Sequence, residues 1–381
     1  YLLKNCLLVN EGKITPTDVL IKNGRIEKIA SSISNADGAT EINAEGKYLL
    51  PGAIDDQVHF REPGLTHKGD LYTESKAAIA GGVTSFIDMP NTNPNVLTMD
   101  ILDEKYRIAS NQSLANFGFF LGVNGDNLDE VIKLDTSKLL GVSDDGLYFT
   151  KKGNLLADNP ETMEKLFANC KSIIAIHSEK EQIIEENETL YREQYGENVP
   201  VEFHPIIRSE KACYEATKRA IELANKHQAR LHILHLTTEA ETHLFRNDIP
   251  LQEKNITTEV SVHHLWFNNE DYQKLGTLIK WNPAIKTKKD QTGLLKALLD
   301  DRVDLVTTDH APHTLEEKQN TYFKAMSGAP IVQHSLNIML EFYKQGQISL
   351  EKIAEKMCHN PAILYQIQKR GFIREGYYAD L

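Results

Sequence analysis

The residue types that could do chemistry gather after short apolar runs of the chain. Imidazoles and a carboxylate follow four such runs, in residues 55–64, 174–179, 232–236 and 306–313. Each histidine alone could be a hydrogen-bonded core residue, but the repetition after four runs favours a metal centre. Histidine and carboxylate ligands without thiolates suit Zn²⁺, with other borderline divalent ions as alternatives.

Two further patterns concern side-chain direction. Gln57, His59 and Arg61 are two residues apart, so on a strand all three would share one face. The segment Ser143-Asp144-Asp145-Gly146 offers adjacent carboxylates, of which only one can point into a site. Asp-Gly is also common in turns, and the residues by themselves favour an acidic turn there.

Predicted strands and helices, which must position these residues, alternate along the chain from Pro51 onward. Strand-like runs are predicted at residues 85–89, 171–176, 230–234, 257–262 and 304–307, and helices at 71–80 and 209–226. This α/β alternation predicts a (β/α)8 TIM-type barrel, whose active site lies at the C-terminal ends of its strands. An open doubly wound sheet is the alternative, although no glycine-rich nucleotide loop opens a strand–helix unit.

The two ends of the chain are predicted to form a small composite β domain. Short strands are expected at residues 6–9, 19–21 and 25–29, with Asn23-Gly24 as a hairpin turn. Residues 369–381 also look like a hairpin and a strand. We therefore expect a β unit at 1–50, a barrel at 51–365 and a return to the β unit at 366–381, incomplete because the chain stops at an apolar residue.

Bulk composition excludes several classes of function. A length of 381 residues suits a barrel of about 250 residues plus a smaller unit. The net charge of −12 argues against nucleic-acid binding but leaves a small anionic substrate open. The four cysteines are far apart, which predicts reduced thiols. Without a long apolar run or a signal peptide, the sequence predicts a cytoplasmic protein that does not contact membranes.

Taken together, these segments resemble the dihydroorotase branch of the amidohydrolase superfamily, the cyclic amidohydrolases. The resemblance covers nearly the whole chain. Its specific motifs, in this order, are His59-Phe60-Arg61-Glu62-Pro63-Gly64, Gly81-Gly82-Val83-Thr84, Met89-Pro90-Asn91-Thr92-Asn93-Pro94 and Asp309-His310-Ala311-Pro312-His313.

The resemblance implies roles for individual residues. The implied metal ligands are His59, Asp145, His177, His235 and Asp309. Asp309 would also handle the proton of the attacking water, and Asp145 would bridge two ions in place of the carboxylated lysine of other types. The implied substrate contacts are Arg61 and Asn91 for a carboxylate, Asn282 near the pyrimidine ring, and His313.

Two departures from the family pattern leave two features of the metal centre undecided, the number of bound ions and the identity of the bridging residue. Gln57 stands where the family has the first histidine of an H-x-H pair, and its neutral amide is a weaker ligand. One or two Zn²⁺ ions are therefore expected, with the second position weakened or empty. The stretch between Asp145 and His177 is longer than in the aspartate-bridged type, so a carboxylated lysine is the alternative bridge. Lys151 and Lys152 lie nearby, but neither matches the lysine-type motif, and Asp145 is the expected bridge.

The implied function is the reversible hydrolysis of dihydroorotate to N-carbamoyl-L-aspartate in pyrimidine biosynthesis. A divalent metal would supply a hydroxide at neutral pH, and Asp309 would carry the proton. An allantoinase or hydantoinase would share the metal cluster without needing Arg61 and Asn91. A non-catalytic dihydroorotase-like partner of aspartate transcarbamoylase is the other alternative, suggested by Gln57. The family also implies a homodimer.

Overall fold

The larger part of the chain is a closed barrel of parallel strands. The structure, a computed structural model, describes residues 1–34, 36, 38–147, 156 and 159–381. Its barrel strands, in order around the ring, are β6 (Ala53–Val58), β7 (Val83–Asp88), β8 (Asn116–Phe119) continued by β9 (Leu121–Gly122), β10 (Gly141–Ser143), β11 (Ile173–Ile176), β12 (Arg230–Ile233), β13 (Ile256–Ser261) and β14 (Leu305–Thr307).

The ring closes where the last strand meets the first. Val58, at the end of β6, forms a parallel bridge with His310, just after β14, and the His59 amide donates to the His310 carbonyl at 2.7 Å. All the neighbouring strands pair in parallel, which confirms the predicted barrel over the alternative open sheet.

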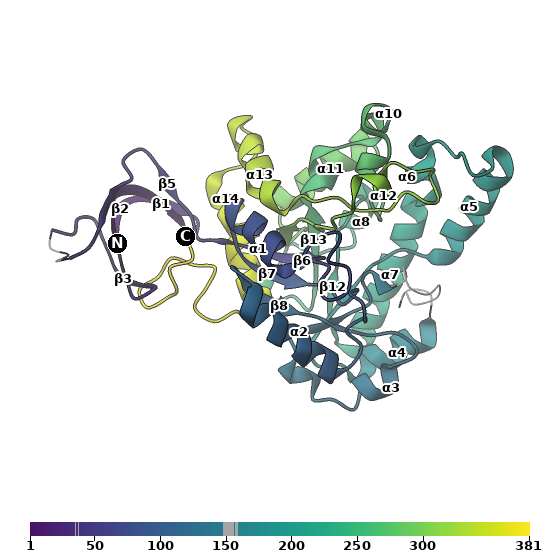
Figure 1. The fold of residues 1–381 in the computed structure, drawn as a ribbon, viewed down its shortest axis with the longest axis horizontal. Coiled ribbons are helices and arrows are strands. Elements are labelled where there is room, and N and C mark those ends of the chain that lie inside the picture. Colours follow the sequence, from purple (N-terminus) through teal and green to yellow (C-terminus); the bar gives the residue numbers. More distant parts are fainter. Residues whose placement is uncertain (35, 37, 148–155, 157–158) are drawn as a thin grey trace.

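Helices form the outer layer of the barrel (Figure 1). The longer ones are α1 (Leu71–Ala80), α2 (Met99–Gln112), α4 (Pro160–Asn169), α5 (Glu181–Tyr195), α7 (Glu210–His227), α11 (Lys288–Leu299) and α13 (Ser335–Lys344). Short helices are α3 (Leu128–Val131), α6 (His204–Ile207), α8 (Glu239–Thr242), α9 (Val262–Trp266), α10 (Tyr272–Leu275), α12 (Leu315–Lys318), α14 (Leu350–Ala354) and α15 (Asn360–Leu364).

Local sequence explains why the two predicted helices begin where they do. At α1 the Asp70 side chain accepts from the Thr73 amide and Thr73 returns the bond, which forms a capping box. At α7 the Ser209 side chain accepts from the Ala212 amide, and small apolar residues face the barrel. Both helices therefore match their predictions to within a residue.

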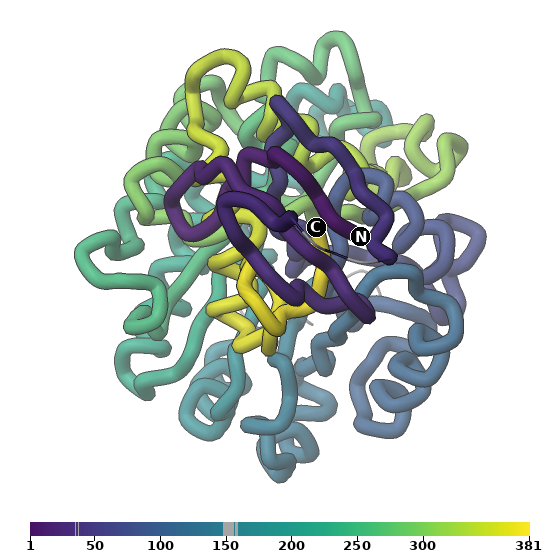
Figure 2. The backbone as a smooth tube through the Cα atoms, turned by 90° about the vertical axis from the view of Figure 1, so that its left-hand side faces the viewer, coloured from purple at the N-terminus to yellow at the C-terminus, as the bar shows by residue number. Residues whose placement is uncertain are grey.

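The N-terminal strands form a separate five-stranded sheet beside the barrel (Figure 1), and this sheet faces the viewer in Figure 2. They are β1 (Leu2–Asn10), β2 (Lys13–Lys22), β3 (Arg25–Ala30), β4 (Glu41–Asn43) and β5 (Tyr48–Leu49). Asn23 and Gly24 both have positive φ and connect β2 to β3, which confirms the predicted hairpin turn. The sheet has its own apolar cluster, which includes Ile373 from the C-terminal segment.

The C-terminal segment returns to this sheet, but not as the predicted hairpin and strand. It forms a single bridge, from Tyr378 to Arg25, and the Ala379 amide donates to the Gly24 carbonyl. Positive φ at Lys369, Gly371 and Gly376 turns the backbone repeatedly, so no strand can extend there. We propose the division at about residues 50 and 365 on these contacts.

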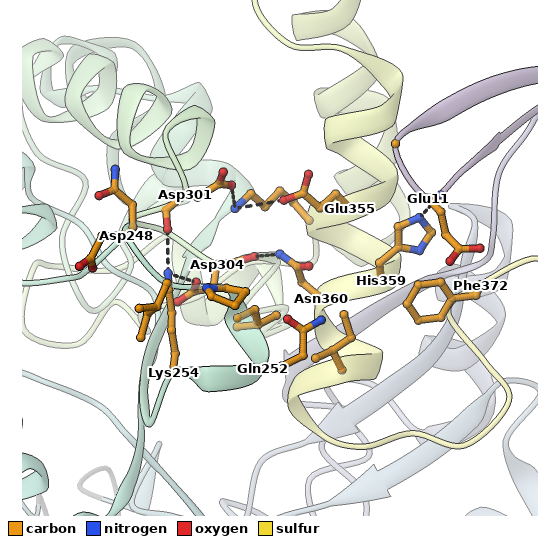
Figure 3. A pocket seen from close by; sticks show the side chains of 17 residues that line it. Glu11, Asp248, Gln252, Lys254, Asp301, Asp304, Glu355, His359, Asn360 and Phe372 are labelled. Atoms are coloured by element: carbon orange, nitrogen blue, oxygen red, sulfur yellow. Dashed lines mark hydrogen bonds and ion pairs between the residues drawn. The ribbon is translucent and has the colours of Figure 1, made fainter.

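Charged side chains at the N-terminal end of the barrel strands pair with one another. They line a cavity of about 560 Å³, to whose lining Glu11 of the β unit contributes beside His359 and Phe372 (Figure 3). Lys254 bonds Asp304 at 2.7 Å, and Lys356 lies 2.8 Å from Asp301. The four cysteines are buried and free, as predicted, and none of the described helices is both long and apolar enough to cross a membrane.

Candidate active site

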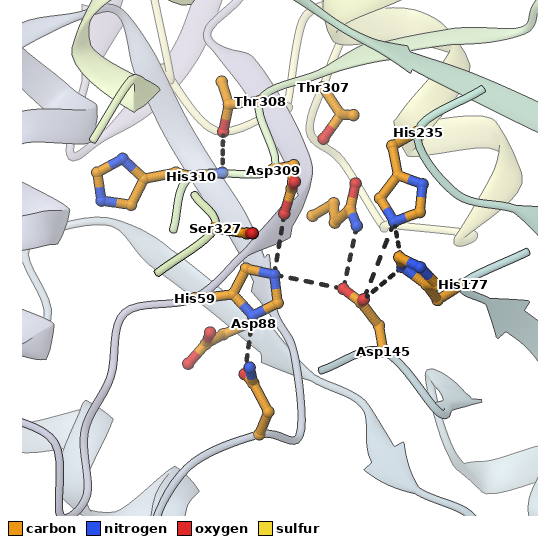
Figure 4. Close-up of polar contacts among 12 residues, drawn as sticks. His59, Asp88, Asp145, His177, His235, Thr307, Thr308, Asp309, His310 and Ser327 are labelled. Atoms are coloured by element: carbon orange, nitrogen blue, oxygen red, sulfur yellow. Dashed lines mark hydrogen bonds and ion pairs between the residues drawn. The ribbon is translucent and has the colours of Figure 1, made fainter. Parts of the chain in front are cut away.

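The predicted metal ligands converge at the C-terminal end of the barrel (Figure 4). They follow β6, β10, β11, β12 and β14 as His59, Asp145, His177, His235 and Asp309, respectively. All five are buried. Their ligand atoms form two groups, one of His59, Asp145 and Asp309 and the other of Asp145, His177 and His235, each within 4.8 Å.

Asp145 belongs to both groups and lies between them. Its Oδ2 is 3.3 Å from His59 Nε2, which is itself 3.0 Å from Asp309 Oδ1. Its Oδ1 is 3.5 Å from His177 Nδ1 and 3.9 Å from His235 Nε2. One carboxylate oxygen therefore faces each group, which is the arrangement of a carboxylate that can bridge two cations.

The charges of these residues fit a cation between them. Burial alone would lower the pKa of His59, but the bonds with Asp145 and Asp309 outweigh it and raise the pKa to about 10. Bonds with Asp145 and Glu179 likewise raise the pKa of His177 to about 9 despite burial. The metal-free protein must therefore hold protons in this cluster, where a divalent ion can replace them.

Gln57 lies at the edge of the first group. Its Nε2 donates to Asp145 Oδ2 at 3.0 Å, and its Oε1 is buried with no hydrogen-bond partner among the described residues. Rotation of this amide by 180° about its last side-chain bond would turn the oxygen toward the group in place of the nitrogen. An amide oxygen is thus available where the family has a histidine.

Three of the site residues have left-handed backbones although none is glycine. The φ angles are 68° at Arg61, 36° at His235 and 47° at Asp309. Such conformations cost on the order of 1–3 kcal/mol each and collect at functional sites. The strand β6 already ends at Val58, so the prediction that Gln57, His59 and Arg61 share one strand face is wrong for Arg61.

The arginine turns instead toward the segment after β14. Its Nε donates to the Pro312 carbonyl at 3.1 Å, and Nη2 lies 3.2 Å from His313 Nε2. Burial lowers the pKa of Arg61 to about 10, which leaves it a cation at neutral pH. Burial, together with Arg61 and Lys68, lowers the pKa of His313 to about 2, so this imidazole is neutral.

A small cavity of about 20 Å³ joins the metal cluster to the predicted substrate residues. It is lined by His59, Arg61, Asn91, Asp145, Trp281, Asn282, Asp309, Ala311, Ser327 and Gly328. His313 is not part of this lining. Instead, His313 lines an adjoining cavity of about 410 Å³ together with Arg61, Asn91 and Gly146. The Oδ1 of Asn282 is buried without a hydrogen-bond partner among the described residues.

The acidic segment after β10 is both a turn and a part of the site. Asp145 faces the cluster, whereas Asp144 accepts from the His177 and Leu156 amides at 2.9 and 2.7 Å, so only one carboxylate points inward, as predicted. Gly146 has φ of 72°, and a Cβ there would lie 2.1 Å from Asn91 Nδ2. Lys151 and Lys152 lie outside the described residues.

Several polar residues around the cluster were not predicted from the sequence. Glu179 bonds the far side of the His177 ring, and the short spacing His177-Ser178-Glu179 is the one signal that could have indicated it. Deeper in the barrel, His232 lies 3.0 Å from Glu259 and 3.5 Å from Asp56. Burial and mutual repulsion raise the pKa of Asp56 well above its usual range, and burial does the same for Glu259, so this group holds protons of its own.

Comparisons with known proteins agree with this architecture. The model of the amidohydrolase family matches residues 48–381. A dihydroorotase of Methanosarcina acetivorans is 32% identical over 100% of this chain and 82% of the relative. One of Carboxydothermus hydrogenoformans is 32% identical over 99% and 86%. The solved L-hydantoinase (dihydropyrimidinase) of Arthrobacter aurescens superposes with a TM-score of 0.90 at 26% identity, over 99% of this chain and 85% of that chain. The chain therefore belongs to the amidohydrolase family, on the dihydroorotase branch that its motifs predict.

Proposed function

We propose that this protein is a dihydroorotase, which opens the ring of dihydroorotate to N-carbamoyl-L-aspartate and closes it again. The observation that carries this proposal is a buried guanidinium, Arg61, in the same cavity as the metal cluster. The substrate has a carboxylate on its ring, and a guanidinium is the side chain that binds a carboxylate with two parallel hydrogen bonds. The names of the whole-length relatives support the same substrate.

The donor set fits a divalent metal, and we propose Zn²⁺. His59, Asp145 and Asp309 would hold one ion, and Asp145, His177 and His235 the other. When bound, the metal polarises a carbonyl and makes water a stronger acid. Gln57 adds only a neutral ligand beside His59, so the position at His59, Asp145 and Asp309 is the weakened one. The group of Asp145, His177 and His235 should bind its ion more tightly.

Asp309 is the proposed proton carrier. Its carboxylate belongs to the first metal group, 3.0 Å from His59 Nε2, and lines the cavity that Arg61 and Asn91 also line. In the hydrolytic direction it takes a proton from the attacking water. As the bond between the ring carbonyl carbon and nitrogen breaks, it gives a proton to that nitrogen.

Arg61 and Asn91 hold the other end of the substrate. Together they place the ring with its carbonyl toward the metal groups, and such positioning supplies much of the rate gain in reactions of this kind. Asn282 and His313 are the proposed further contacts, because the first offers an oxygen to which no described residue donates and the second a neutral imidazole.

A hydantoinase-type cyclic amidase is the second candidate, since the L-hydantoinase fold superposes closely. Its substrate ring has no carboxylate for Arg61 to bind. An assay of the zinc-loaded protein with dihydroorotate, hydantoin and allantoin separates the two activities. Turnover of dihydroorotate alone supports the proposal, and turnover of hydantoin or allantoin instead would replace it.

The proposed cellular location and assembly partners of the enzyme are inferred from the family rather than from the site. A cytoplasmic location, a homodimer and an association with aspartate transcarbamoylase remain proposals. The convergence of five ligand side chains in one cluster favours an active enzyme over a non-catalytic partner. Sedimentation of the purified protein, with and without aspartate transcarbamoylase, tests both kinds of assembly.

A further inference from the structure

We propose that Glu179, held by Arg208, is a positioning residue that fixes the His177 imidazole with its Nδ1 toward the metal centre. This inference rests on the metal centre of the proposed function. Glu179 Oε2 lies 2.7 Å from His177 Nε2, and neither side chain is exposed to solvent. Glu179 lies outside both groups of candidate ligands.

The contact determines which nitrogen of His177 can bind a metal. A neutral imidazole has one N–H and one lone pair. When Nε2–H donates to Glu179, the lone pair is on Nδ1, which lies 3.0 Å from His235 Nε2 and 3.5 Å from Asp145 Oδ1. A carboxylate behind a metal-binding histidine fixes the tautomer and the ring orientation in this way.

Arg208 holds the carboxylate in turn. Its Nε and Nη2 donate to Glu179 Oε2 at 2.9 and 2.6 Å, and Glu179 Oε1 lies 3.9 Å from Cys213 Sγ. Arg208 follows α6, and Glu179 follows β11, as His177 does. The orientation of His177 is therefore supported by a charged pair that links the barrel to its outer layer.

The three histidines of the centre differ in this support. The Nδ1–H of His59 donates to the neutral Oδ1 of Asn91 at 2.7 Å, and His235 Nδ1 is buried with no hydrogen-bond partner among the described residues. In this set only His177 is backed by a carboxylate from outside the two groups. Loss of Glu179 should therefore weaken the group of Asp145, His177 and His235 in particular.

The chain offers a matched control in Glu241. This glutamate is also buried, but its two oxygens accept from the hydroxyls of Thr217 and Thr238, each at 2.7 Å, rather than from an imidazole. Replacement of either glutamate by methionine removes a buried acceptor and keeps the length of the side chain. Glu179→Gln is the conservative variant, because its amide oxygen can still accept from His177.

The experiment measures Zn²⁺ affinity in the full chain by competition with a chromophoric chelator, with the Co²⁺ absorption spectrum and melting temperature alongside. Glu179→Met should bind the tighter ion about 10- to 100-fold more weakly and change the Co²⁺ spectrum. Glu179→Gln should recover most of that affinity, and Glu241→Met should match the wild type. In excess zinc, Glu179→Met should regain activity with an unchanged KM.

Wild-type affinity and an unchanged Co²⁺ spectrum in a folded Glu179→Met variant would overturn the inference. Should that variant fail to fold because the buried charge of Arg208 loses the Glu179 carboxylate, the double variant Glu179→Met, Arg208→Met removes both charges and must show the same loss. A wild-type protein that binds no metal would instead defeat the proposed function, before any variant is compared.

Discussion

The Nδ1 of His59 lies 2.7 Å from the Oδ1 of Asn91. One amide thus joins the two halves of the site, because its oxygen orients a candidate metal ligand while its nitrogen is left for the carboxylate of the substrate. The two functions of Asn91 can be separated by substitution.

Asn91→Asp keeps an oxygen for His59 but places a negative charge beside the substrate carboxylate. We expect KM for dihydroorotate to rise about 100-fold with metal content unchanged, since like charges in contact cost several kcal/mol. Asn91→Leu should raise KM and also lower metal occupancy. Equal metal content in the two variants would show that the bond to His59 has no role.

Arg61→Ala removes the cation that we assign to the substrate carboxylate. Loss of a bidentate, charge-assisted contact should lower kcat/KM by about 100- to 1,000-fold, mainly through KM. Zinc content, measured by elemental analysis, should stay at the wild-type level because Arg61 belongs to neither ligand group. A variant that turns over dihydroorotate normally would remove the main support for this substrate.

Gln57→His tests whether the amide limits the first metal group. An imidazole binds Zn²⁺ more strongly than an amide oxygen, so the variant should retain more zinc per chain after dialysis against a weak chelator. The wild type under the same dialysis is the control. No gain in bound zinc would mean that Gln57 does not determine the occupancy of this group.

Gly146→Ala should displace Asn91, since its Cβ would lie 2.1 Å from Asn91 Nδ2. Gly12→Ala is the matched control, because Gly12 has a similar φ of 74° but no atom within 4 Å of the added Cβ. Both variants should lose about 1 kcal/mol of stability from the left-handed backbone. Only Gly146→Ala should lose activity, and equal activities would contradict the role of this close approach.

The metal-free protein should become less stable as the pH rises. The pKa values of His59 and His177 are raised in the fold to about 10 and 9, from 6.5, so their protons stabilise the fold fully below pH 6.5. That contribution is lost as the pH rises through 9 and 10. Thermal unfolding of chelator-treated protein between pH 6 and pH 10 measures it. Zinc replaces these protons, so the zinc-loaded protein should show a smaller loss.

Much of this arrangement was predictable from sequence because it depends on periodicity and on strand ends. Alternating strands and helices predict the barrel, and a barrel brings the residues after its strands together at one end. His59, His177 and Asp309 therefore meet although they are far apart in the chain. The hairpin at Asn23 was predictable because Asn-Gly adopts positive φ with little strain.

The features that sequence did not predict depend on three-dimensional contacts. Arg61 leaves the strand pattern because its backbone is left-handed, and only the surrounding structure stabilises that conformation. Arg208 is 29 residues from Glu179, and no periodic pattern connects them. The C-terminal strand was wrongly predicted because apolar residues there pack on the β unit from turns rather than from a ladder.

Zinc-dependent turnover of dihydroorotate by the purified protein decides whether the cluster of His59, Asp145, His177, His235 and Asp309 is a catalytic metal centre. The protein is stripped of metal, titrated with Zn²⁺, and assayed with dihydroorotate at each step while bound zinc is measured. We expect activity to be absent without metal and to rise in proportion to the first zinc bound per chain. Full activity in the metal-free protein, or stoichiometric zinc binding without turnover, would contradict this expectation.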